Sequence, residues 1–221
     1  MSEQSDIEQV AVAWARLTGW LAEYAPASYA SLLAPAAEKA ITAAEARLVH
    51  ALDFGFPPEL KVLWQVCGGV QKVDVPGNED GELWAGKFLP GGIFLAPEPS
   101  LWQRLRFGPG EEDPWDGAVF VSFLDAEEPT GAGEHGVYVS YSADPTLRGV
   151  GRWSTMTGPD LSPPAWPSVT AYLEAACELL ETGGGPLLDA LGGQRPALAL
   201  GCLVWIDPED GLEVPWRLVH P

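Results

Sequence analysis

Residues 41–69, ITAAEARLVHALDFGFPPELKVLWQVCGG, predict two helices separated by a proline-containing bend. Proline disfavours helix in the residue before it and suits the first turn of a new helix, so the bend is expected at 54–58. Gly68 and Gly69 are expected to end the second helix, because glycine takes the left-handed cap conformation readily. Apolar side chains recur at helical spacing on both sides of the bend, at Leu48, Leu52, Leu60, Leu63, Trp64 and Cys67.

Two capping boxes predict where the N-terminal helices begin. Residues 42–45 (TAAE) have the required spacing, since Thr42 can accept a hydrogen bond from the N–H three residues on and Glu45 can reach back. Residues 5–8 (SDIE) give the same signal for an earlier helix that runs to Tyr24. The apolar stripes of these helices need a common partner. We therefore expect one core that contains Trp14, Leu17, Leu48, Leu63 and Trp64.

The composition of the sequence changes after residue 71, where Gly and Pro become frequent. Alternating β-branched and aromatic residues predict short strands at 83–85, 93–95, 118–123 and 136–141. Turns are expected at Gly81, 90–92 and 113–114. Sequential short strands with tight connections favour an antiparallel sheet.

The C-terminal part of the chain predicts helices followed by a hairpin. Ser168 has the chemistry of an N-cap, and the apolar face that follows it ends at the glycines 183–185. A short helix is expected at 186–191, and residues 198–206 and 212–219 are expected to pair as a hairpin. This order predicts an α+β fold, with N-terminal helices packed on a mainly antiparallel sheet, a later helix and a C-terminal hairpin.

The opening helices also follow the order of features of a known family. The matching residues are Glu45, Leu48, Phe56, Pro57 or Pro58, Leu60, Leu63 and Gly68. On these residues the sequence resembles the SUKH superfamily, named partly after the fungal Smi/Knr regulators of cell-wall synthesis. Its members have a tryptophan-bearing helix, an E-x-x-L helix, a hydrophobic-proline step and a third helix that ends in glycine. The sequence departs at Val49, where the family often has glycine, in four extra residues between Leu48 and the prolines, and in an ending without Asn-Gly.

The resemblance implies what the chain does and how it is divided. It implies a single SUKH-like domain over residues 1–221, best matched at 5–182, with 183–221 as a C-terminal extension. Bacterial members are commonly immunity proteins that bind and neutralise a cognate toxin domain, often a nuclease or a deaminase. The resemblance therefore implies a non-catalytic protein-binding function. Two alternatives stay open: a regulatory adaptor like the fungal members, and a hydrolase with an unrecognised site.

The formal net charge of −19 argues against some classes of partner. Nucleic acids and anionic membranes are bound through Lys and Arg, so neither is expected, whereas a basic protein fits. The N-terminus is polar and acidic, without the basic region of a signal peptide. No apolar run approaches the ~20 residues of a transmembrane helix. We therefore expect a cytoplasmic protein.

No cofactor, metal or catalytic residue is expected from the motifs. Residues 131–136 (GAGEHG) spell G-x-G-x-x-G, but the dinucleotide fingerprint needs a strand before it and a helix after it, and here a predicted strand follows. Metal-ligand spacing is lacking among the three histidines, His50, His135 and His220. Buried, reduced thiols are expected at the three scattered cysteines, Cys67, Cys177 and Cys202.

An acidic region is the best candidate for an interaction surface. Residues 74–134 hold thirteen acidic and three basic residues, a difference of −10. An exposed tryptophan among carboxylates would anchor a basic partner, and the charges would steer it. The alternative is a solvated loop whose Trp115 lies in the core. The candidate partner-binding residues are Glu111, Glu112, Asp113, Trp115, Asp116, Glu127, Glu128 and Glu134.

Overall fold

The computed structural model describes residues 3–78, 83–106, 120–142, 145–156, 158–160 and 165–220. The helices are α1 (Glu3–Tyr24), α2 (Pro26–Ala30), α3 (Glu38–Leu52), α4 (Pro58–Val66), α5 (Pro97–Arg106), α6 (Val169–Thr182) and α7 (Pro186–Ala190). The strands are β1 (Ile93–Phe94), β2 (Phe120–Asp125), β3 (His135–Ser140), β4 (Gly149–Ser154), β5 (Gly158–Pro159), β6 (Arg195–Ala199), β7 (Cys202–Ile206) and β8 (Trp216–Leu218). They form two antiparallel sheets, in the orders β1-β2-β3-β4-β5 and β7-β6-β8. The fold is α+β, as predicted.

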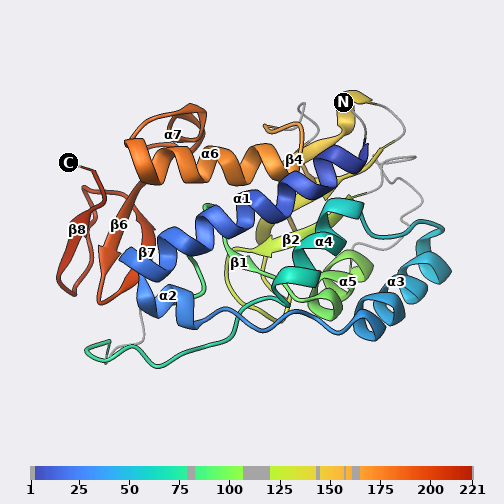
Figure 1. Cartoon of the computed structure of the whole chain (residues 1–221), viewed down its shortest axis with the longest axis horizontal. Coiled ribbons are helices and arrows are strands. Elements are labelled where there is room, and N and C mark those ends of the chain that lie inside the picture. Colours follow the sequence, from blue (N-terminus) through green and yellow to red (C-terminus); the bar gives the residue numbers. More distant parts are fainter. Residues whose placement is uncertain are drawn as a thin grey trace.

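One hydrophobic core joins the helices to the larger sheet. The Trp14 ring of α1 lies 5.3 Å from that of Phe94 in β1, centre to centre. The Trp64 indole N–H of α4 donates to the Leu95 carbonyl oxygen at 2.9 Å. α1 packs against both α6 and α4, and these helices lie in front of the sheet in Figure 1. The core expected from the sequence is confirmed, because it contains Trp14, Leu17, Leu48, Leu63 and Trp64.

The bend between α3 and α4 lies where the prolines predicted it. α3 ends at Leu52, Asp53 caps it in the left-handed conformation (φ 60°), and α4 begins at Pro58. The predicted start of the first helix is two residues late, because α1 begins at Glu3 and Ser5 lies inside it.

The predicted capping box at residues 42–45 is wrong. α3 already begins at Glu38, so Thr42 lies inside the helix. The Glu45 carboxylate instead accepts a hydrogen bond from the backbone N–H of Phe56 at 3.1 Å. It also accepts one from the Lys61 ammonium at 2.9 Å. Glu45 therefore stabilises the bend between the two helices and not the start of the first.

The glycine cap predicted for α4 is also wrong. The helix ends at Val66, and Cys67 after it is extended, not left-handed. The Gly68 N–H donates to the Ala34 carbonyl oxygen at 3.0 Å. A Cβ on Gly68 would lie 2.7 Å from that oxygen. Gly68 therefore allows two backbone segments to approach closely, which a larger residue would prevent.

Three predicted strands are confirmed as β1, β2 and β3, with shifted boundaries. The strand predicted at 83–85 does not form. Instead, the Asn78 side chain accepts from the Leu83 N–H and donates to the Leu83 carbonyl oxygen, each at 3.0 Å. The turn at 90–92 is confirmed by the hydrogen bond that closes it from residue 92 to residue 89. Two predicted turns lie outside the described residues, namely Gly81 and 113–114.

Helix α6 has the ends that the sequence predicts. The Ser168 hydroxyl accepts from the Ala171 N–H at 3.0 Å, and Gly183 caps the helix in the left-handed conformation (φ 76°). The short helix predicted at 186–191 is confirmed as α7.

The predicted C-terminal hairpin forms, but between other strands than expected. The apolar run 198–206 is not one strand, because β6 and β7 pair with each other through a tight turn at Leu200 and Gly201. Both turn residues have positive φ (49° and 79°), as a two-residue turn that matches strand twist requires. β8 then pairs with β6 instead of β7. A leucine in the left-handed conformation is uncommon, so the residue types concealed this turn.

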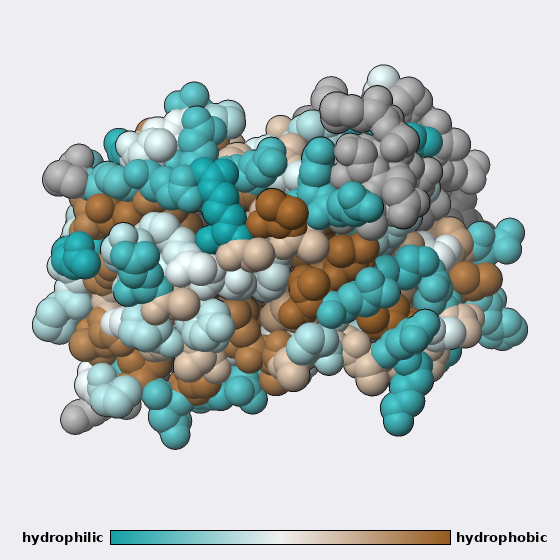
Figure 2. Space-filling model, viewed as in Figure 1, coloured by the Kyte–Doolittle hydropathy of each residue, from teal (hydrophilic) through white to brown (hydrophobic). Residues whose placement is uncertain are grey.

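On the helical side of the molecule, the apolar residues that the structure describes are scattered and do not form a single face. Hydrophobic residues reach this surface in areas separated by hydrophilic ones (Figure 2). Large apolar side chains that are partly exposed over the described residues include Val12, Tyr24, Tyr29, Val66 and Trp102. Such scattered exposure is ordinary for a globular protein and does not mark a site.

Candidate protein-binding surface

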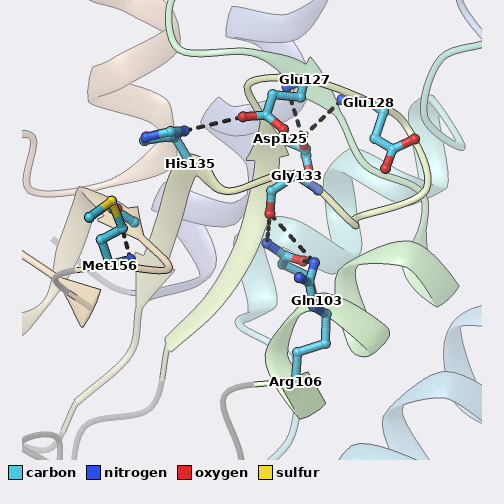
Figure 3. A network of polar contacts seen from close by, with 9 residues as sticks. Gln103, Arg106, Asp125, Glu127, Glu128, Gly133, His135 and Met156 are labelled. Carbon is cyan, nitrogen blue, oxygen red and sulfur yellow. Dashed lines mark hydrogen bonds and ion pairs between the residues drawn. The ribbon is translucent and has the colours of Figure 1, made fainter.

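The loop between β2 and β3, residues 126–134, folds around one buried carboxylate. Asp125 ends β2 and is fully buried. Its carboxylate accepts hydrogen bonds from the backbone N–H groups of Glu127 (2.8 Å), Glu128 (2.9 Å) and Gly133 (2.9 Å), as Figure 3 shows. Burial raises the pKa of the Asp125 carboxyl above its ordinary value, although the three N–H donors oppose that shift. We call residues 126–134 the acidic loop.

Helix α5 supports the acidic loop from the other side. The Gln103 amide donates to the Gly133 carbonyl oxygen at 3.4 Å, and the Arg106 guanidinium donates to that of Gly131 at 3.3 Å. Both glycines are required where they stand. Gly131 has a φ of +74°, and a Cβ on Gly133 would lie 2.1 Å from a carboxylate oxygen of Asp125. The loop is thus held to both β2 and α5 through its backbone.

Because the backbone of the acidic loop is held from inside, its acidic side chains point outward. Glu127 and Glu134 are exposed, and Glu128 is half-buried. The Glu127 carboxylate lies 3.2 Å from His135 Nδ1, and about half of each side chain is accessible to solvent. The arrangement presents fixed negative charge at the surface, which favours encounter with a positively charged partner.

The turn between β4 and β5 lies next to the acidic loop. The Thr155 N–H donates to the Glu134 carbonyl oxygen at 2.8 Å. Met156, the following residue, is 87% exposed. Methionine is adaptable in shape and common at binding surfaces, and here it is an exposed apolar side chain in the turn next to the acidic loop. Sequence reasoning missed Met156, because only the pairing of β4 with β3 brings it to this loop.

The structure brings together three of the eight candidate partner-binding residues. Glu127, Glu128 and Glu134 share the acidic loop. The others lie outside the described residues, so their prediction stays a prediction: Glu111, Glu112, Asp113, Trp115 and Asp116.

The motifs that could have indicated catalysis have structural explanations. Residues 131–136 run from the acidic loop into β3, with no helix after them, so they lack the geometry of a dinucleotide site. Over the described ranges, no group of three or more His, Cys, Asp or Glu side chains is placed to hold a metal ion. The three cysteines are buried, as expected. Burial raises the pKa of the Cys177 and Cys202 thiols to about 11 and that of Cys67 above its ordinary value.

Comparison with known proteins leaves the family open. No protein-family model and no curated protein matches this chain. None of the helices in the described part of the chain is long and apolar enough to cross a membrane.

Proposed function

We propose that this chain is a non-catalytic protein-binding domain that uses the acidic loop to bind a basic protein. The observation that carries the proposal is the Asp125 carboxylate, which fixes the loop backbone while Glu127 and Glu134 stay exposed. A surface that is ordered before binding loses less conformational entropy when the partner arrives. The net charge of −19 adds a long-range attraction for a cationic protein.

We further propose that the partner is a toxin domain of the nuclease or deaminase type, and that binding neutralises it in the cytoplasm. The SUKH resemblance of the opening helices supports this role. Charge supports it too, because enzymes that act on nucleic acid need a positive cleft for phosphate. The acidic loop would then take the place of the substrate's negative charge.

Co-purification with a candidate toxin domain, followed by a binding and inhibition assay, tests the proposal. The candidate is to be sought among the neighbouring genes, as the C-terminal domain of a large secreted protein. We expect saturable binding with loss of toxin activity. Binding without inhibition would favour the adaptor alternative, and an absence of binding to any neighbouring toxin domain would contradict the immunity role.

Two matched variants connect binding to the acidic loop. The test variant is Glu127→Gln, Glu128→Gln and Glu134→Gln; the control removes three exposed carboxylates elsewhere, through Glu8→Gln, Glu174→Gln and Glu213→Gln. Both variants change the net charge equally. We expect the test variant to weaken binding more than the control, because close charges contribute more than distant ones. A separate variant tests the sequence-based prediction at Glu111, Glu112, Asp113 and Asp116.

A further inference from the structure

A cleft of about 950 Å³ opens where the larger sheet meets the C-terminal sheet. One wall comes from β3 and β4, and the other from the turns that precede β6 and follow β7. Its volume is at the upper end of the range for ligand sites. Three carboxylates line it, those of Asp160, Asp207 and Asp210, against the cationic Arg152 and the imidazole of His135.

A second cavity, of about 290 Å³, continues this cleft. The two share Gly91, Ala126 and Gln194 in their linings, so they form one groove, which we call the inter-sheet groove. Most of the residues that line the smaller part have apolar side chains, among them Leu89, Val204, Trp205, Ile206 and Leu212, and none of them is acidic. The groove therefore has one compartment with acidic side chains and one whose side chains are mostly apolar, which we call the acidic and the apolar compartment; they meet at Gly91, Ala126 and Gln194.

Two side-chain hydrogen bonds hold the walls of the inter-sheet groove together. The Trp205 indole N–H donates to the Phe88 carbonyl oxygen at 2.9 Å, and the Arg152 guanidinium donates to that of Ala190 at 2.8 Å. Arg152 is thus directed toward a carbonyl group of α7. Because these hydrogen bonds hold its walls, the groove is already formed before a ligand arrives, so its residues lose little conformational entropy on binding.

We infer that the inter-sheet groove binds an exposed segment of the basic partner, with a basic side chain in the acidic compartment and a neighbouring apolar side chain in the apolar one. This inference rests on the proposed function and adds a second contact to the acidic loop. The carboxylates of Asp207 and Asp210 pair with the basic side chain. Lys87 lines the apolar compartment and repels cations there, so the orientation of the segment is fixed.

A labelled peptide tests the inference without the toxin. The probe is a seven-residue peptide of alternating arginine and leucine with glycine at both ends; two controls replace arginine by glutamate or leucine by serine. Fluorescence anisotropy measures binding to the whole chain. We expect saturable binding of the probe, weaker binding of the serine peptide and none of the glutamate peptide. If the probe does not bind saturably, or if all three peptides bind alike, the inference is wrong.

Matched variants place the peptide in the groove. Asp207→Asn with Asp210→Asn removes two groove carboxylates, whereas Glu209→Gln with Glu213→Gln removes two exposed carboxylates from the same region that do not line the groove. We expect the first pair of substitutions to lower the affinity for the probe about threefold or more, and the second pair to lower it less. Equal effects would mean that the peptide responds only to net charge and would overturn the inference.

Two substitutions of Gln194 test whether the sign of the charge in the groove decides binding of the probe. Gln194→Arg should weaken binding of the probe and Gln194→Glu should not, because Gln194 lines both compartments.

The toxin assay separates the two proposals. If groove variants bind the toxin normally while acidic-loop variants do not, the inference fails and the proposed function stands. If neither set affects toxin binding, both fail.

Discussion

Two carboxylates, those of Glu45 and Asp125, organise loops by accepting hydrogen bonds from backbone N–H groups. The sequence predicted an N-terminal role for Glu45 from its spacing to Thr42. That spacing also occurs inside a helix, and α3 starts earlier, after Ala37, whose side chain makes no cap. Asp125 could not be predicted, because its role depends on a partner eight residues away, at Gly133, and on the closure of the loop between them.

Asp125→Asn should destabilise the protein by about 1–3 kcal/mol, because an amide can replace only part of the acceptor set and places an N–H against a backbone donor. Urea unfolding measures the change. The control is the exposed residue Asp74, for which Asp74→Asn should change stability by less than about 0.5 kcal/mol. Equal stability of Asp125→Asn and wild type would show that the carboxylate does not hold the acidic loop.

The raised pKa of Asp125 predicts a pH dependence with a definite sign. The folded protein binds the Asp125 proton more tightly than the unfolded chain does, so this group adds stability at low pH. That contribution declines as pH rises from the ordinary carboxyl range through the raised folded pKa. The stability of wild type relative to Asp125→Asn should therefore fall over this acid range, as urea unfolding at a series of pH values would measure. A relative stability that rises instead would contradict the assigned shift.

Among the helices and strands, the sequence predicted those that have clear apolar periodicity and missed α5 and β4, which depend on their neighbours in the fold. α5 was missed because its buried face includes polar residues, namely Ser100, Gln103 and Arg104. β4 was missed because glycines interrupt its alternation. A Cβ on Gly151 would lie 2.4 Å from the Tyr138 ring, so the glycine is required by the packing of β3, which a single strand cannot reveal.

Leu63→Ala should destabilise the protein by about 2–5 kcal/mol, because Leu63 is fully buried on α4 and its truncation leaves a cavity. Val66→Ala is the control on the same helix, since Val66 is partly exposed and should matter less. A loss below about 0.5 kcal/mol for Leu63→Ala in urea unfolding would mean that α4 does not pack as described.

Over the whole molecule, the net charge of −19 predicts a basic class of partner but not the surface that would bind it. Composition is sufficient to predict an acidic protein, and the clustering of carboxylates at 111–134 indicated where charge gathers; of these, the structure describes Glu127, Glu128 and Glu134. Met156 and the inter-sheet groove could not be predicted, because each depends on strands that are distant in sequence. Glu134 and Thr155 meet only through the β3–β4 pairing.

Steering of a basic partner by the acidic loop is tested by the association rate, measured as a function of salt concentration. Stopped-flow kinetics with the toxin domain would compare wild type with the Glu127→Gln, Glu128→Gln and Glu134→Gln variant. We expect wild-type association to slow steeply between 0.01 and 0.15 M salt, because the Debye length falls from ~30 to about 8 Å. Dissociation should change less.

The variant should associate more slowly at low salt and show a shallower salt dependence than wild type. The control variant at Glu8, Glu174 and Glu213 should stay closer to wild type, since its lost charges are elsewhere. If the loop variant has the same association rate and the same salt dependence as wild type, the acidic loop does not steer the partner, and the binding surface lies elsewhere.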